Sequence, residues 1–202
     1  MAARSIIIGI AGAALGLAAA VALLPQVRER LFPSVERQVS GKALIGGAFT
    51  LTDSTGKRVT EQSFRGKYML LFFGYTSCPD ICPAGLQLMA GALEKLGPKA
   101  ERITPVFISV DPERDTPDKL AGYVKNFDPR LVGLTGTPEE IAAVTKAYKV
   151  YYAKTPSKEH PDDYTMDHTS IIYVMDPNGD FVTHFTPATS VDEMAAKLGK
   201  IL

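Results

Sequence analysis

The sequence contains few of the side chains on which many catalytic and binding sites depend. Its 202 residues include two cysteines, three histidines and no tryptophan, and no internal repeat is visible. Thiol chemistry is therefore confined to one pair of side chains, and repeat architectures are excluded. The absence of tryptophan excludes no class of function.

The sequence also lacks a predominant charge. Its 22 basic residues balance 22 acidic ones, and no stripe of lysine and arginine is visible. A nucleic-acid-binding protein would show such a basic footprint, so nucleic acid is not expected as a partner. The apolar fraction of 46% and the charged fraction of 22% are those of a globular protein.

One long apolar run stands at the N-terminus. Residues 5–24 carry no charged side chain and, as a helix, would span about 30 Å, the thickness of the hydrocarbon core of a membrane. The run exceeds the apolar part of an ordinary signal peptide, which favours an uncleaved anchor over a cleaved signal. We therefore expect a membrane anchor over residues 1–25, a juxtamembrane linker over 26–44 and a folded domain over 45–202.

The orientation of this anchor does not follow from its flanking charges, because basic residues lie on both sides of the run. A short N-terminus followed by a long domain usually places the domain outside the cytoplasm, where disulfides persist. No transit peptide rich in arginine and serine precedes the run, which favours a bacterial protein. The expected location is the bacterial inner membrane, spanned once, with the soluble domain in the periplasm.

Both cysteines lie in the segment Thr76–Pro83 (TSCPDICP), between an apolar run that predicts a buried strand and a helical pattern. Cys78 and Cys82 are one helical turn apart, so their sulfur atoms can meet in a disulfide or around one soft metal ion. A helix N-terminus favours the thiolate and is expected to lower the thiol pKa. Two buried, inert cysteines are the alternative, but burial gives no reason for this spacing and these flanking prolines.

The remainder of the domain alternates between strand and helix patterns. Strands are predicted at residues 46–52, 57–60, 68–73, 103–110, 131–134, 150–153, 168–175 and 180–185, and helices at 84–96, 117–127, 138–148 and 191–198. Residues 154–167 are predicted as a polar loop, and Pro105 predicts an irregular beginning for its strand. Thr116, Thr137 and Ser190 are the expected N-caps. The pattern predicts an α/β domain with a thioredoxin-like mixed sheet flanked by helices, preceded by one transmembrane helix.

Two acidic segments near the predicted site have more than one interpretation. In the segment 111–117 (DPERDTP), turn formation and helix capping explain most of the residues. Asp111 could also hydrogen-bond near the cysteines or contribute to a docking surface. Asp80, between the cysteines, could tune the charge of the site or cap the helix that follows.

A metal ion held by the two thiolates would need a further donor. His168 is the best candidate, because the end of a neighbouring strand can bring it to the cysteines, and Asp167 and Thr169 could orient its ring. His160, in the polar loop, and His184, on a hairpin strand, have no such setting, and an arbitrary histidine is more often a surface residue. Two thiolates and an imidazole suit Cu(I), Cu(II) or Zn(II), and thiolate softness favours copper.

Several motifs, in this order, resemble those of the Sco/SenC family. They are Thr76–Pro83, Asp111–Pro117, Tyr151–Tyr152, Asp167–Ser170 and Tyr173–Pro177. Members of this family are membrane-anchored, thioredoxin-like copper proteins needed to assemble the binuclear copper centre of cytochrome c oxidase. The resemblance implies that Cys78, Cys82 and His168 are the metal ligands and that each domain binds one copper ion.

The resemblance also implies a function and its partners. A copper metallochaperone would deliver the ion to the oxidase subunit that carries the binuclear centre. The alternative is a thiol–disulfide oxidoreductase that reduces the copper-ligand cysteines of that subunit, in which Cys78 would attack and Cys82 would resolve. A non-enzymatic chaperone is favoured, and enzymatic reduction stays open. A second periplasmic copper chaperone or a thiol reductant would be a further partner.

Three other classes of protein fit the sequence less well. Metal-free oxidoreductases of this kind usually have two residues between their cysteines and a proline before the strand that faces them, whereas this chain has three residues and His168. A peroxiredoxin-like peroxidase would have a threonine three residues before the attacking cysteine, but Thr76 is two residues before Cys78. A structural zinc module of a membrane scaffold is the remaining alternative.

Overall fold

The computed structural model of the chain describes residues 44–156 and 164–202. The predicted anchor, almost all of the predicted linker and His160 lie outside these residues. Within the described ranges, no helix is both long enough and apolar enough to cross a membrane.

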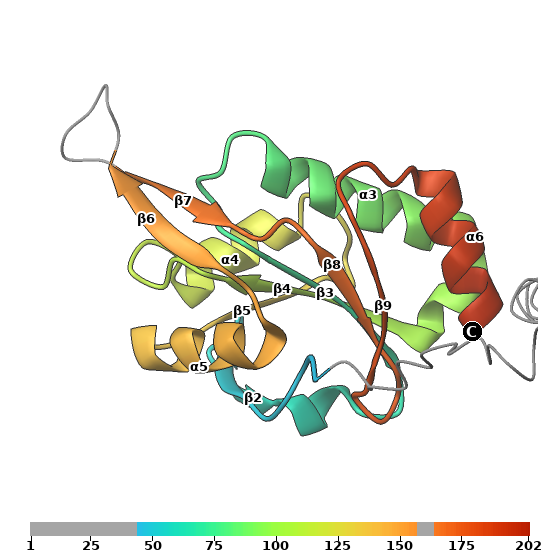
Figure 1. Ribbon diagram of the computed structural model, residues 1–202, viewed down its shortest axis with the longest axis horizontal. Helices are drawn as coiled ribbons and strands as arrows, with labels where there is room; N and C mark the ends of the chain where they lie inside the picture. Colours follow the sequence, from blue (N-terminus) through green and yellow to red (C-terminus); the bar gives the residue numbers. More distant parts are fainter. Residues whose placement is uncertain (1–43, 157–163) are drawn as a thin grey trace, which may run out of the picture. The chain divides into compact units, whose positions relative to one another are not determined.

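A mixed sheet of seven strands runs through the described domain (Figure 1). In spatial order its strands are β2 (Arg58–Thr60), β1 (Thr50–Asp53), β5 (Val132–Thr135), β4 (Ile103–Ser109), β3 (Tyr68–Gly74), β8 (Ile172–Met175) and β9 (Phe181–Phe185). The central strands β3, β4 and β5 are parallel, and the outer pairings are antiparallel. The central strand β3 is buried along almost its whole length, which explains its unbroken apolar sequence.

Helices cover both faces of this sheet, as the sequence predicts. The helices α3 (Ile81–Leu96), α4 (Pro117–Val124) and α6 (Val191–Ile201) lie on one face, and α5 (Pro138–Tyr148) lies on the other (Figure 1). Short 3-10 segments at Glu61–Phe64 and Gly97–Arg102 connect the regular elements. The predicted mixed α/β architecture is confirmed.

Alternate side chains of β3 supply the two halves of the core. Phe72 faces α3, and Gly85 makes room for it, because a Cβ atom on Gly85 would lie 2.9 Å from the Phe72 ring. Phe73 points to the other face and packs on Tyr148 of α5, with 5.6 Å between the ring centroids. Successive strand residues point to opposite faces of the sheet, so Phe72 and Phe73 contact different helices. The contact between Phe72 and Gly85 places α3 close to the C-terminal half of β3.

The three predicted N-caps are confirmed. The side-chain oxygen of each capping residue accepts a hydrogen bond from the backbone N–H three residues later, at 3.2 or 3.3 Å. These bonds satisfy amide groups that the first turn of a helix leaves without partners.

The predicted polar loop at 154–167 is wrong at both of its ends. β6 (Tyr152–Pro156) and β7 (Tyr164–His168) pair antiparallel as a small sheet separate from the main one. Much of this hairpin is exposed, so its sequence lacks the apolar alternation that predicts a strand. The strand predicted over 168–175 is also interrupted, because β8 begins only at Ile172.

Two smaller predictions are wrong as well. The beginning of the strand around Pro105 is regular, because Pro105 lies within β4, opposite Leu70 of β3, although the incomplete pairing expected there is found. The ladder between β4 and β5 starts only at Val106, so Pro105 precedes the part of β4 that is paired on both sides. The helix predicted to end at Phe127 ends, as α4, at Val124.

Candidate metal centre

The ends of three elements bring the predicted site residues together. Cys78 follows β3, Cys82 belongs to the first turn of α3, and His168 ends β7. One donor atom from each side chain lies within 4.8 Å of the others, and no carboxylate of the described residues joins them. We call these three side chains the Cys–Cys–His cluster.

Cys82 is the buried member of the cluster, with none of its surface exposed. Gly74, the last residue of β3, makes room for it: a Cβ atom there would lie 2.7 Å from the Cys82 Sγ and 2.8 Å from the Phe107 ring. Burial raises the pKa of the Cys82 thiol far above its ordinary value, and the neighbouring Cys78 adds to the rise. The predicted lowering of this pKa is wrong because desolvation outweighs the helix terminus.

Cys78 lies in the turn before α3, not within the helix as its spacing suggests. It is half-buried, and its Sγ accepts a hydrogen bond from the backbone N–H of Cys82 at 3.4 Å. Asp80 occupies the N-cap position, but its side chain makes no capping hydrogen bond. The sulfur of Cys78 therefore takes the place of the missing side-chain cap and accepts a hydrogen bond from an amide of the first turn.

His168 presents one ring nitrogen to the cysteines. Its Nε2 lies 3.2 Å from the Cys82 Sγ, and its Nδ1 lies 3.1 Å from the carbonyl oxygen of Thr169. Because a carbonyl can only accept, we assign the ring proton to Nδ1, which leaves the Nε2 lone pair directed at the sulfur. Burial lowers the pKa of His168, so the imidazole is neutral at neutral pH.

The two residues predicted to orient His168 differ in what they contact. Thr169 does hold the ring, although through its backbone carbonyl rather than its side chain. Asp167 accepts a hydrogen bond from the hydroxyl group of Thr155 at 2.9 Å. A metal-binding imidazole commonly donates its second N–H to an oxygen such as the Thr169 carbonyl, and that hydrogen bond fixes the tautomer and the orientation of the ring.

Two aromatic rings beside His168 were not singled out from the sequence. Phe72 and Tyr75 meet the imidazole edge-on, with ring centroids 6.1 and 6.0 Å away. Tyr75 is buried, and burial raises its pKa, to which the nearby Cys78 contributes. The signal that could have found both is their place at the end of β3, next to the cysteine segment. These rings limit the access of water to the cluster.

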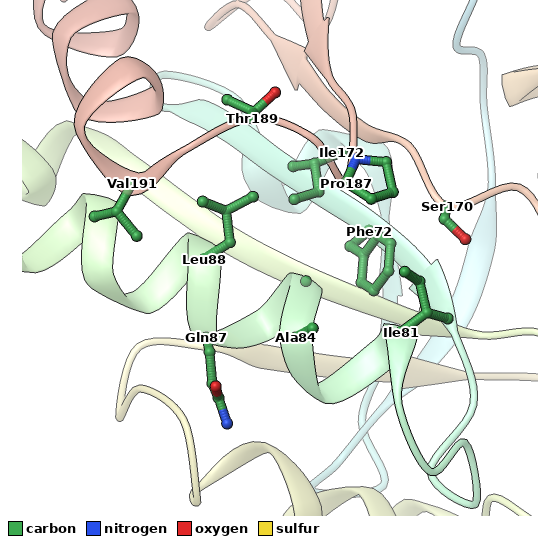
Figure 2. A pocket seen from close by; sticks show the side chains of 11 residues that line it. Phe72, Ile81, Ala84, Gln87, Leu88, Ser170, Ile172, Pro187, Thr189 and Val191 are labelled. Atoms are coloured by element: carbon green, nitrogen blue, oxygen red, sulfur yellow. The ribbon is translucent and has the colours of Figure 1, made fainter.

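An apolar pocket of about 340 Å³ opens beside the cluster (Figure 2). Figure 2 shows the α3 side chains of Ile81, Ala84 and Leu88 facing Ile172, Pro187 and Val191 across the pocket. Phe72 lines this pocket and also contacts His168, so the Phe72 side chain separates the pocket from the cluster.

The other two histidines are not placed at the cluster. His184 lies on β9, is exposed and stacks on Phe181 with 6.3 Å between ring centroids. His160 falls outside the described residues. Met166, a soft donor close to His168 in sequence, is 5% exposed and packs in the core.

The cluster fits a soft cation in its donor chemistry. In the protein without metal, the Cys82 thiol proton can bond to the Nε2 of His168. A soft metal ion in place of that proton would bind the sulfur and the imidazole together, and coordination would deprotonate the thiol despite its burial. Two sulfur donors and one nitrogen suit copper or zinc better than a hard cation such as Mg²⁺.

A family model described as SCO1/SenC matches residues 37–202. The chain belongs to the SCO1/SenC family. A human relative in this family, named "Protein SCO1 homolog, mitochondrial", is 44% identical over 172 residues, which are 84% of this chain and 56% of that protein. The chain spans about half the length of the curated relatives from human, Arabidopsis thaliana and mouse that it matches.

Solved SCO1/SenC structures have the same fold. The structure of ScoI from Arabidopsis thaliana with copper bound superimposes with a TM-score of 0.73 at 46% identity, over 77% of this chain and 96% of that one. ScoI from Bradyrhizobium japonicum with copper bound gives a TM-score of 0.72 at 50% identity, over 78% of this chain and 99% of that one. The resemblance found in the sequence is thus confirmed at the level of family and fold.

Proposed function

We propose that this chain is a copper-binding protein of cytochrome c oxidase assembly, which holds one copper ion between Cys78, Cys82 and His168. It delivers that ion to the oxidase subunit that carries the binuclear copper centre. The observation that carries the proposal is the convergence of two sulfur atoms and one oriented, neutral imidazole within 4.8 Å. Membership of the SCO1/SenC family and the copper bound by two relatives support it.

The unequal exposure of the two thiols supports release of the ion as well as its capture. Cys82 is fully buried, whereas Cys78 is half-buried in the turn before the helix. An incoming thiolate of the acceptor would approach the metal from the side of Cys78 and displace it first. Cys82 and His168 would then be replaced in turn, so copper stays bound to sulfur throughout the exchange.

We also propose that residues 1–25 anchor the protein in a bacterial inner membrane and that residues 45–202 work in the periplasm, joined by the linker 26–44. The uncharged run at 5–24 supports the anchor. A second copper chaperone would load the site there, or a thiol reductant would keep its two cysteines reduced.

Reduction of the acceptor's cysteines is a second candidate function, and the same difference in exposure favours it. A half-buried Cys78 followed by a fully buried Cys82 is the order that thiol–disulfide exchange requires: one sulfur attacks the disulfide and the other releases the mixed disulfide. The acceptor disulfide would be reduced to two thiols while Cys78 and Cys82 become a disulfide.

A transfer assay separates the two functions. The protein, loaded with one equivalent of Cu(I), is mixed with the apo copper-centre domain of the oxidase subunit, whose cysteines are either reduced or oxidised. Delivery predicts that copper moves to the reduced acceptor and that His168→Ala abolishes the transfer. No movement of copper, together with equally fast reduction of the oxidised acceptor by the copper-free protein and by His168→Ala, would instead establish the reductase.

A further inference from the structure

The segment 111–117 (DPERDTP) lies between the two halves of the cluster. It forms the loop from β4 to α4, and we call it the 111–117 loop. It contains two buried carboxylates, because Asp111 is 1% exposed and Asp115 is 0% exposed. Carboxylates are rarely buried unless hydrogen bonds or charges compensate them, so the partners of these two show what the loop holds.

Asp115 holds the cysteine side of the cluster. Its Oδ2 accepts a hydrogen bond from the backbone N–H of Thr76 at 2.8 Å, and its Oδ1 accepts one from the Thr76 hydroxyl group at 2.5 Å. Ser109, at the end of β4, donates a further hydrogen bond at 2.7 Å. Since Thr76 lies two residues before Cys78, Asp115 fixes the turn that carries this thiol to the end of β4.

Asp111 and Arg114 hold the histidine side. Asp111 accepts hydrogen bonds from the Arg114 Nε at 2.5 Å and from the Tyr164 hydroxyl group at 2.7 Å. Arg114 also donates to the carbonyl oxygen of Tyr164 at 2.8 Å, and its guanidinium carbon lies 3.7 Å from the centroid of the Tyr164 ring. Tyr164 begins β7, the strand that ends in His168.

These contacts matter because the hairpin that carries His168 has little other support from the sheet. β6 and β7 pair with each other and not with the seven-stranded sheet. A two-stranded hairpin is at best marginally stable alone, so its position depends on side-chain contacts to the rest of the domain. The ion pair of Lys154 with Glu113, at 2.6 Å, also joins hairpin and loop, but both side chains are about half exposed, and such pairs contribute little.

We propose that the 111–117 loop sets the distance between the cysteine turn and His168, and that Arg114 is a positioning residue for the imidazole ligand. The inference rests on the proposed copper site and deepens it. Without Arg114, the two sulfur atoms would still bind copper, but the hairpin would no longer hold the imidazole at bonding distance. Loss of a residue that orients a metal ligand typically lowers metal affinity by about 10- to 100-fold.

A double-mutant cycle on the full-length protein tests this proposal. Cu(I) affinity is measured by competition with a chromophoric Cu(I) chelator in the wild type, Arg114→Gln, His168→Ala and the double mutant. We expect Arg114→Gln to weaken binding about tenfold, and the double mutant to bind no more weakly than His168→Ala alone. The Cu(II) absorption and electron paramagnetic resonance spectra of Arg114→Gln should shift towards those of His168→Ala. An equal loss of affinity in both backgrounds, or no loss at all, would overturn the proposal.

A matched control comes from a second arginine–aspartate pair, at the opposite end of the parallel strands. Arg130 contacts Asp128 at 2.7 and 2.9 Å, just before β5 begins. Arg130→Gln removes a comparable pair and should leave both copper affinity and the Cu(II) spectra unchanged. A tenfold loss of affinity in this control would show that general destabilisation suffices, and the positioning role of Arg114 would fall.

Arg114→Lys keeps the positive charge but loses the planar guanidinium group that reaches both Asp111 and Tyr164. If Arg114→Gln does not fold, the double-mutant cycle is repeated with Arg114→Lys. It should weaken binding severalfold in the wild-type background and leave His168→Ala unchanged. Failure of the wild type itself to bind Cu(I) would sink the proposed function. Copper binding by the wild type with no coupling between Arg114 and His168 would sink the positioning role alone.

Discussion

Cys82 and His168 show how strongly neighbouring residues set the state of a side chain. Burial disfavours both the thiolate of Cys82 and the imidazolium of His168, so these two members of the cluster are held in their neutral forms before metal arrives. A soft cation can replace the proton of the Cys82 thiol, and His168 can bind it through the Nε2 lone pair while the imidazole itself stays neutral. The same burial that makes Cys82 a poor free thiolate therefore makes it a good partner for a metal ion.

Gly74 is the residue on which the burial of Cys82 depends most directly. Gly74→Ala would place a methyl group 2.7 Å from the Cys82 Sγ and 2.8 Å from the Phe107 ring. We expect a loss of about 1–3 kcal/mol in the free energy of unfolding, from overpacking, together with weaker copper binding. Urea denaturation and chelator competition measure the two effects.

Gly122, in α4, provides the matched control, because a Cβ atom there would meet nothing within 4 Å. Gly122→Ala should leave copper binding unchanged and raise the free energy of unfolding by about 0.5–1 kcal/mol, since alanine is the better helix former. Equal behaviour of the two alanine variants would contradict the packing of Cys82 against Gly74.

Asp128 provides a pH-dependent prediction far from the cluster. Hydrogen bonds from the side chain and backbone of Arg130 hold the pKa of Asp128 below its ordinary value of 3.8. The stabilisation is therefore fully present above the unfolded pKa and is lost as the pH falls through the lower, folded value. Asp128→Asn should reduce the free energy of unfolding by about 1–3 kcal/mol at pH 7. Urea titrations should show the difference from wild type narrowing below pH 3.8; a constant difference down to the acid limit would contradict this assignment.

At the scale of elements, the β6–β7 hairpin links the fold to the site. It lies outside the main sheet, and its last residue supplies the imidazole of the cluster. Its contacts with the 111–117 loop are made by side chains, whereas β3 is hydrogen-bonded to strands on both of its sides. The hairpin should therefore open locally more often than the centre of the sheet does.

Hydrogen exchange on the copper-free and copper-loaded protein tests this difference. Copper would join His168 to the two cysteines, so we expect slower exchange of the backbone amides of β7 after loading. The amides of β9, an edge strand of the seven-stranded sheet that carries none of the three cluster residues, should keep their rates. Unchanged protection of β7 would mean that the imidazole does not bind the ion.

The elements differ in how much of them could be predicted from the sequence. β3 could be predicted because a strand buried on both faces has an unbroken apolar sequence. The N-caps could be predicted because a serine or threonine before a proline or an acidic turn commonly accepts a hydrogen bond from a backbone N–H of the first helical turn. Most of the hairpin could not be predicted: the strand expected at 150–153 covers only the start of β6. The remainder is polar, and part of its support comes from Arg114 and Asp111, which are distant in sequence. Cys78 lies before the helix, where its sulfur accepts a hydrogen bond from the backbone N–H of Cys82. The spacing of the two cysteines alone does not reveal this contact.

At the scale of the whole molecule, the cluster is assembled from distant parts of the chain. Cys82 and His168 are 86 residues apart in sequence, and the parallel arrangement of β3 and β4 brings the cysteine turn and the 111–117 loop to the same edge of the sheet. The sequence could nominate the three donors because thiols and histidines are rare in it. The sequence also singled out the segment 111–117, but the burial of Asp111 and Asp115 and the partners of their carboxylates are found only from the fold.

The nearest neighbours of copper in the loaded protein test the central claim most directly. X-ray absorption spectroscopy on the protein with one equivalent of Cu(I) should show two sulfur atoms and one nitrogen atom bound to the metal. In His168→Ala the metal should lose its nitrogen neighbour and keep both sulfur neighbours. Replacing either cysteine by alanine should remove one sulfur neighbour, and the protein should no longer bind copper stoichiometrically. A wild-type spectrum without the nitrogen neighbour, or one that the His168→Ala substitution leaves unchanged, would contradict the Cys78–Cys82–His168 site.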